Sequence, residues 1–110
     1  MLESPLEIVN QRMNYYNAHD LEKFLETYSS DVAIFTYPDK LLARGIDHMR
    51  NLFTPMFESG NVHVEIISQL ASDRYIINEE MVTYADTTTR YVSIYEVRQG
   101  KIQSVRFVRD

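Results

Sequence analysis

The side chains with the clearest chemical potential lie in the second half of the chain, in segments that alternate like β-strands. His63 and Glu65 are two positions apart in one segment, and Glu80 lies in the next. Residues two apart on a strand point to the same face, so His63 and Glu65 share one. A carboxyl next to another carboxyl and to tyrosine phenols can act as a general acid or base. Glu80 is therefore our first candidate for a catalytic residue, with Tyr95 as a donor that stabilises a developing oxyanion.

Hairpin geometry predicts which of these side chains meet. If Ser72-Asp73 forms a two-residue loop, Glu65 lies opposite Glu80, and if Thr87-Thr88 forms the next loop, Glu80 lies opposite Tyr95. One face of the sheet would then carry the following set: His63, Glu65, Glu80, Val82, Tyr84, Tyr91, Ser93 and Tyr95. Such a face can line a pocket, or it can face solvent or a second subunit, because polar strand faces usually meet water. A one-residue slip would reverse the assignment for a whole strand.

Three helices are predicted ahead of these strands. Ser4-Pro5-Leu6-Glu7 is a capping box with proline at the first helical position. The predicted apolar stripe of the first helix consists of Leu6, Val9, Met13 and Tyr16. Asp20 is a good N-cap for a second helix that ends at 29–31, and a third helix follows Gly45, with a kink expected at Pro55.

Six strands are predicted, two between the second and third helices and four after the third, and short turns join the strands of each hairpin. The strands are predicted at 32–37, 41–44, 62–70, 75–85, 91–97 and 102–108. Helices first and strands afterwards indicate an α+β fold, in which helices cover one face of an antiparallel sheet. The length of 110 residues predicts a single domain that spans 1–110.

Composition excludes several classes of function. The net charge of −5 argues against a nucleic-acid partner, and no apolar run is long enough to cross a membrane. Without cysteine there is no disulfide or thiolate, and we expect a cytoplasmic protein. A zinc site from His63, Glu65 and Glu80 has no HExxH motif or histidine cluster behind it, so we predict neither a metal nor a cofactor. Ser93 has no evident base that would make it a nucleophile.

Several short motifs occur together and in order. They are Tyr16-Asn17-Ala18-His19-Asp20-Leu21-Glu22, Tyr28-Ser29-Ser30-Asp31-Val32, Arg44-Gly45, His63-Val64-Glu65-Ile66, Ile94-Tyr95-Glu96-Val97 and Gly100-Lys101-Ile102. Together they resemble the SnoaL-like, steroid-isomerase-like branch of the nuclear transport factor 2 (NTF2-like) superfamily, over about Val9 to Val108. The resemblance implies a cone-shaped, cystatin-like fold, in which three helices close a strongly curved sheet over an apolar cavity. It also implies a homodimer through the outer sheet face, and cavity positions for Glu80, Ser93 and Tyr95.

The catalytic sets of this superfamily do not carry over. At the positions of the ketosteroid isomerase tyrosine, base and aspartate this chain has Arg12, Thr36 or Tyr37, and Ser93. At the positions of the Asp-Arg-Asp set of limonene-epoxide-hydrolase-like members it has Glu80, Val82 and Phe107. The aspartate and histidine of SnoaL-type polyketide cyclases have no secure counterpart here.

Two hypotheses for the function remain. The first is a small-molecule-binding protein that acts as an isomerase, a cyclase or a hydrolase-like enzyme on an apolar substrate, with Glu80 and Tyr95 as catalytic groups and Tyr16 and Tyr37 at the pocket mouth. The second is a non-catalytic module that binds a ligand or associates as a dimer.

For the last hairpin, a two-residue turn at Gln99-Gly100 would turn Arg106 inward, whereas a bulged turn would turn Val105 and Phe107 inward. The family pattern favours the second arrangement.

Overall fold

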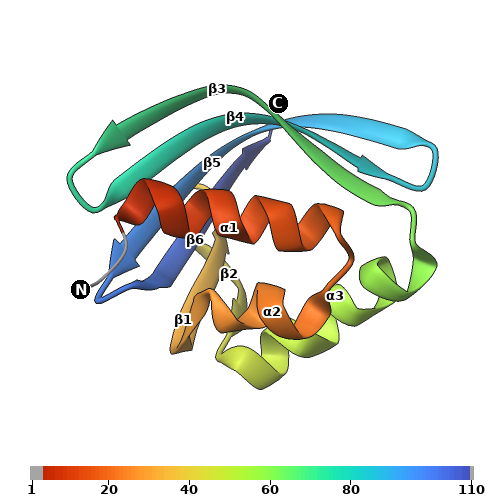
Figure 1. Ribbon diagram of the computed structural model, residues 1–110, viewed down its shortest axis with the longest axis horizontal. Coiled ribbons are helices and arrows are strands. Elements are labelled where there is room, and N and C mark those ends of the chain that lie inside the picture. Colours follow the sequence, from red (N-terminus) through yellow and green to blue (C-terminus); the bar gives the residue numbers. More distant parts are fainter. Residues whose placement is uncertain (1–3, 110) are drawn as a thin grey trace.

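The computed structural model describes residues 4–109, so the two ends of the predicted 1–110 domain lie outside the described residues. The elements are α1 (Pro5–Asn17), α2 (Leu21–Glu26), β1 (Tyr28–Thr36), β2 (Lys40–Arg44), α3 (Ile46–Ser59), β3 (Val62–Ser72), β4 (Tyr75–Tyr84), β5 (Thr87–Arg98) and β6 (Lys101–Arg109). The three helices lie against one face of a curved sheet, which arches over them (Figure 1). The predicted α+β fold, with three helices on a strongly curved sheet, is confirmed.

The sheet has six strands in the order β2-β1-β6-β5-β4-β3. All neighbouring strands are antiparallel except β1 and β6, which are parallel. The prediction of an antiparallel sheet is therefore confirmed for four strand pairs and wrong for β1 and β6. β1 is the first strand in the chain and β6 is the last, and the two lie side by side in the sheet.

The first helix begins at the predicted capping box. Ser4 Oγ accepts from the backbone N–H of Glu7 at 3.2 Å, and the Glu7 carboxylate accepts from the N–H of Ser4 at 3.0 Å. The stripe was wrong at one position, because Leu6 is 37% exposed and Ile8 lies in the core instead. Ile8 and Arg12 are four residues apart and share the face that meets the sheet.

The second helix is shorter than predicted. It ends at Glu26, whereas the sequence predicts its end at 29–31. These residues belong to β1, which begins at Tyr28. Tyr28 is buried in the core and pairs with Ile102 of β6. Pairing with another strand, which the local sequence does not reveal, decides this boundary.

Two of the predicted hairpin turns differ from the structure. The β3–β4 loop is Asp73-Arg74, one residue later than predicted, and the β4–β5 loop is Ala85-Asp86, two residues earlier. Asp73 and Ala85 have positive φ (53° and 55°), which single-residue turn rules do not expect for alanine. The last hairpin combines the two predicted arrangements. It has a two-residue turn at Gln99-Gly100, and a bulge follows in β6, where Gln103 has no pairing partner on β5.

This bulge decides which side chains of β6 face the helices. Val105 is fully buried and Phe107 borders the interior, as the family pattern favoured. Arg106 points outward, where its guanidinium lies 4.4 Å from the ring centre of Phe35.

Aromatic rings join the three helices below the sheet. Phe24 of α2 is fully buried, and its ring centre lies 5.0 Å from those of Phe53 and Phe57 on α3. Tyr16 of α1 and Tyr28 of β1 lie 5.9 and 5.3 Å from the same ring. These distances are typical of stabilising aromatic pairs, so Phe24 is the centre of the helical layer.

The loop after α1 is attached to the edge of the sheet. The Asn17 amide bonds the backbone of Val64 on both sides, donating to its C=O at 3.0 Å and accepting from its N–H at 2.8 Å. His19 Nε2 lies 2.9 Å from the carbonyl oxygen of Val62. The two side chains satisfy backbone groups that an edge strand would otherwise expose.

Candidate functional site

A cavity of about 680 Å³ lies between the inner face of the sheet and the helices. Its apolar walls come from α3, from inward-facing strand positions and from the β4–β5 loop: Ile34, Leu42, Leu52, Phe53, Met56, Val64, Val82, Ala85 and Phe107. The remaining lining residues are Arg12, Tyr16, Thr36, Glu80, Tyr84, Thr87, Thr89, Tyr91 and Arg109. This size and this mixture of many apolar groups with a few polar ones are typical of small-molecule sites.

Glu80 is the acidic group at the inner end of the cavity. It is 1% exposed, and its carboxylate accepts three hydrogen bonds. Oε1 accepts from Ser93 Oγ at 3.0 Å, and Oε2 accepts from Tyr95 OH at 2.8 Å and from Asn78 Nδ2 at 3.1 Å. Three donors directed at one carboxyl group replace the hydrogen bonds to water that its burial removes.

A chain of amides sets the orientation of Asn78. Gln69 Nε2 donates to Asn78 Oδ1 at 2.9 Å and to Asn10 Oδ1 at 3.1 Å. Because Asn78 Oδ1 accepts from Gln69, its Nδ2 points toward Glu80. Polar groups of α1 and β3 thus help to hold the carboxylate in place.

Arg12 is the cation of the same region. It lies on α1, is 3% exposed, and borders the cavity. Its Nε donates to Tyr28 OH at 2.8 Å, and its guanidinium carbon lies 5.0–5.6 Å from the ring centres of Phe24, Tyr16 and Tyr95. Such contacts compensate part of the cost of burying a guanidinium. Arg12 and Glu80 do not form an ion pair, and Tyr95 contacts both.

Burial and charge together decide the protonation of these groups. Burial alone would lower the pKa of Arg12, but the phenols of Tyr28 and Tyr95 and the carboxylate of Glu80 outweigh burial and raise that pKa. Burial raises the pKa of Tyr95 well above its ordinary value; Arg12 opposes this rise and Glu80 adds to it. Burial likewise raises the pKa of Tyr28, against the effect of Arg12. At neutral pH both phenols are therefore protonated and Arg12 is charged.

Two candidates lie on the other face of the sheet, which corrects the predicted pocket. His63 and Glu65 are exposed, whereas Val62 and Val64 are buried. The later turn and a bulge at Ile66/Ser68 bring Ile66, not Glu65, opposite Glu80, and this net shift of one residue reverses the face of β3. The two carboxylates do not meet, and the zinc site that was considered for His63, Glu65 and Glu80 is divided between two faces.

Tyr37 is also misplaced in the prediction. It is 55% exposed and does not border the cavity, whereas Ile34 and Thr36 of β1 do. Side chains alternate along a strand, so the residue after Thr36 points away from the cavity.

The candidates of β4 and β5 share the inner face with Glu80 in a different register. Glu80 pairs with Tyr91, and Ser93 pairs with Asn78. The predicted pairing of Glu80 with Tyr95 was wrong, although the length of the tyrosine side chain carries its OH to the carboxylate. Tyr16, Val82, Tyr84, Tyr91 and Phe107 border the cavity, whereas Ser93 and Tyr95 lie behind Glu80 and do not line it.

The main omission of the sequence reasoning is Arg12. It entered only as a residue that replaces a catalytic tyrosine of other proteins. An arginine among Ile8, Val9, Met13 and Tyr16, on the face of an amphipathic helix that meets the core, is the signal that could have found it.

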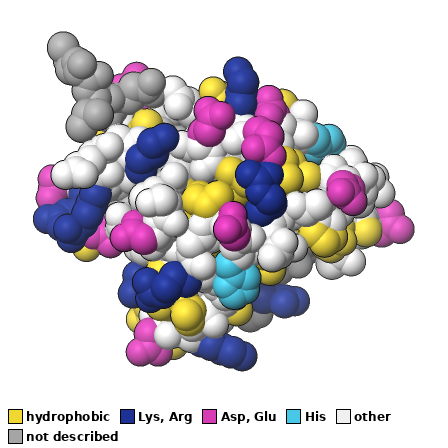
Figure 2. All heavy atoms as spheres, turned by 90° about the horizontal axis from the view of Figure 1, so that it is seen from below, with side chains coloured by type: hydrophobic (Ala, Val, Ile, Leu, Met, Phe, Trp, Pro, Cys, Tyr) yellow, Lys and Arg dark blue, Asp and Glu magenta, His cyan; other side chains and the backbone are white. Residues whose placement is uncertain are grey.

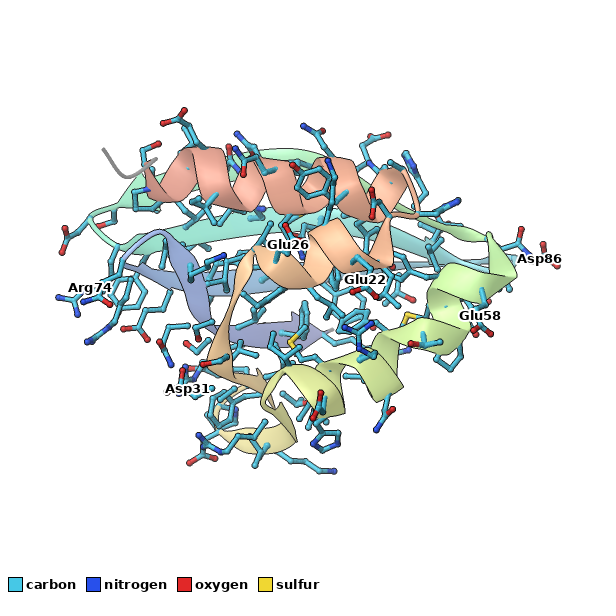
Figure 3. All side chains as sticks on the ribbon, turned by 60° about the horizontal axis from the view of Figure 1, so that its bottom comes forward. Glu22, Glu26, Asp31, Glu58, Arg74 and Asp86 are labelled. Atoms are coloured by element: carbon cyan, nitrogen blue, oxygen red, sulfur yellow. The ribbon has the colours of Figure 1, made fainter. Side chains whose placement is uncertain are left out.

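Charged residues of both signs are exposed on the molecular surface. Arg109 of β6 lines the cavity and is exposed. Glu58, near the end of α3, and Asp86, at the tip of the β4–β5 hairpin, lie at the same end of the molecule (Figure 3). On the face seen from below, acidic and basic side chains are likewise mixed (Figure 2).

Within residues 4–109, no group of three or more histidine, aspartate or glutamate side chains is arranged to hold a metal ion. No helix in this part of the chain is long and apolar enough to span a membrane.

Comparison with known proteins agrees with this architecture. The family model described as SnoaL-like domain matches residues 9–105. An uncharacterized cystatin fold protein from Novosphingobium aromaticivorans is similar with a TM-score of 0.89 and 22% identity, over 97% of this chain and 99% of that one. A comparison with curated proteins gave no match.

An enzyme and a designed binding protein have similar structures. A structure of an LEH-like epoxide hydrolase from M. tuberculosis has a TM-score of 0.82 and 18% identity, over 96% of this chain and 82% of that one. A computationally designed 17-OHP binder has a TM-score of 0.84 and 19% identity, over 98% and 92% of the two chains. At these identities the likeness extends to the fold alone.

Proposed function

Because the chain belongs to the SnoaL-like domain family of the NTF2-like superfamily, we propose that it binds a small, mostly apolar molecule in its cavity. The observation that carries this proposal is the cavity of about 680 Å³, which has apolar walls and two buried, oppositely charged residues at its inner end. Apolar walls supply affinity, and a few fixed polar groups orient the ligand.

A neutral, environment-sensitive dye tests this proposal. N-phenyl-1-naphthylamine should gain fluorescence on binding, and Val82→Trp, which fills the cavity, should abolish the gain. Thr83→Trp is the matched control, because it adds the same side chain at the next position of β4, on the outward face. Equal dye binding by both variants would place the dye elsewhere and contradict the proposal.

Acid–base catalysis is the second candidate function. It is favoured by the position of Glu80, a buried carboxylate that borders the cavity with the protonated phenol of Tyr95 beside it. In this role Glu80 would move a proton on the bound molecule, and Tyr95 would hold the carboxylate in position. The three hydrogen bonds to Glu80 occupy most of the acceptor positions that a base would use, and they make binding the primary proposal.

A proton-exchange measurement separates the two functions. Deuterium incorporation from solvent into a bound enolisable ketone, followed by NMR, should occur for an acid–base enzyme and cease in Glu80→Gln. Binding with no exchange above that of the free ketone would leave a binding protein.

We also propose a homodimer through the outer face of the sheet. Ile77 pairs with Ile94, and Val92 pairs with Val108, in register positions that point away from the helices. All four are only half-buried, as expected for an apolar strip that a second copy would cover. Light scattering should give twice the chain mass, and Ile94→Lys should give one chain mass; a monomer for the unaltered protein would contradict this proposal.

A further inference from the structure

The guanidinium of Arg12 has hydrogen-bond donors that the protein does not use. An arginine has five N–H groups, and the described acceptors for Arg12 are Tyr28 OH for Nε and the sulfur of Met13, at 3.4 Å, for Nη1. Among residues 4–109, every fully buried side-chain nitrogen or oxygen has a partner. Nη2 has no described partner, so it is not fully buried, and Arg12 borders the cavity. Its donors are therefore available to a molecule in the cavity.

The Glu80 carboxylate has one hydrogen-bond acceptor position that no described protein donor occupies. A carboxylate offers about four acceptor positions, and Ser93, Tyr95 and Asn78 occupy three of them. The fourth position is free, and Glu80 also borders the cavity. The inner end of the cavity therefore offers unused donors and one unused acceptor, on residues that both contact Tyr95.

The charges of this region are already balanced. Arg12 contributes one positive charge and Glu80 one negative charge, both almost without solvent. A carboxylate in the ligand would add a third buried charge with no counterion of its own, which is costly in a region of low dielectric.

We infer that the ligand carries, at its inner end, a neutral group that accepts a hydrogen bond from Arg12 and donates one to Glu80. A primary carboxamide is the simplest group with a neighbouring acceptor and donor of this kind. The apolar remainder of the ligand lies along the walls formed by α3 and the strands. This inference rests on the proposed binding function and assigns the two residues that select the ligand.

A near-isosteric series of naphthalenes separates the contributions. 2-Isopropenylnaphthalene has no hydrogen-bonding group, 2-acetylnaphthalene has an acceptor only, naphthalene-2-carboxamide has both, and 2-naphthoate is an anion. Calorimetry should show the ketone binding about tenfold more tightly than the hydrocarbon, since a hydrogen bond to a charged group contributes that much. The carboxamide should bind several-fold more tightly than the ketone, and the carboxylate more weakly than the carboxamide.

Three variants assign the preferences to residues. Arg12→Met should remove the preference for the ketone over the hydrocarbon, whereas Glu80→Gln should reduce only the preference for the carboxamide over the ketone. Arg98→Met, which removes an exposed arginine at the end of β5, is the matched control and should leave all three ratios unchanged.

A spectroscopic measurement keeps the test independent of the variants, in case Arg12→Met does not fold. Bound carboxamide labelled with ¹³C at its carbonyl should show a downfield shift relative to the free compound in an apolar solvent. An unshifted carbonyl, equal affinities for hydrocarbon and carboxamide, or tighter binding of the carboxylate would each overturn the inference while the binding function stands. If none of the four compounds binds, the proposed function falls and the inference falls with it.

Discussion

Replacing Glu80 with glutamine isolates the charge of the buried carboxylate from its shape. Glutamine Oε1 can accept from Tyr95 OH and Asn78 Nδ2, and its Nε2 can donate to Ser93 Oγ, so all three hydrogen bonds can be kept. What is lost is the negative charge that offsets Arg12. We therefore expect Glu80→Gln to destabilise the fold through Arg12.

The structure limits the size of this effect. Arg12 and Glu80 form no ion pair within 4.0 Å, and two unit charges at ~4 Å in an effective dielectric of ~20 interact by ~4 kcal/mol. Removing one member of a buried charge pair in proteins costs roughly 3–5 kcal/mol. A loss of about 3–4 kcal/mol for Glu80→Gln satisfies both limits, and it is a large part of the ~5–15 kcal/mol that stabilises a domain.

A double-mutant cycle measures the coupling directly. Urea unfolding followed by far-ultraviolet circular dichroism would give the free energy of unfolding for the unaltered protein, Arg12→Met, Glu80→Gln and the double variant. The double variant should lose about 1–3 kcal/mol less than the sum of the single losses, because the second change removes a charge that the first left unbalanced. Additive losses, within roughly 0.5 kcal/mol, would refute the reasoning.

Three further predictions follow from the same description. The pKa values of Tyr28 and Tyr95 are raised, so the folded state holds these protons more tightly than the unfolded state does. The free energy of unfolding should therefore be constant below about pH 10 and fall above it by up to ~1.4 kcal/mol per pH unit for each phenol. Urea unfolding between pH 8 and 11 should show this fall, and Tyr95→Phe should lessen its slope. Asn17→Ala should lower the free energy of unfolding by about 1–2 kcal/mol and speed amide hydrogen exchange at Val64. Asn14→Ala, an exposed change on the same helix, is the control. Unchanged exchange at Val64 in Asn17→Ala would contradict the attachment. Gly45→Ala should cost about 1 kcal/mol in thermal unfolding, because φ is +85° at that position, and an unchanged melting temperature would argue against the strain.

Much of the fold could be predicted because it depends on local signals. The capping box at Ser4, the asparagine and histidine motif after α1, and the alternation of the strands are contained in neighbouring residues. The start of β1 at Tyr28 could not be predicted in this way, because it depends on pairing with Ile102, which is distant in sequence.

The candidate site shows the same division. Glu80 and its contact with Tyr95 were predicted, although through a pairing that was wrong, because face assignment along β4 and β5 depends only on parity. The face predicted for His63 and Glu65 was wrong, because a bulge and a displaced turn together shift the pairing of β3 by one residue. A turn with positive φ at alanine has no strong sequence signal, so the strand register that depends on it is poorly predicted from a single sequence.

The attachment of Asn17 and His19 to β3 also bears on how copies of this chain can meet. A bare edge strand is a template onto which another chain can add a strand, and such additions can continue without limit when both edges of every copy are bare. Here the first residues of that edge are already occupied by side chains of the same molecule, because Val62 and Val64 bond His19 and Asn17. The attachment therefore restricts open-ended growth through this edge and leaves the broad faces of the sheet for association that closes on itself.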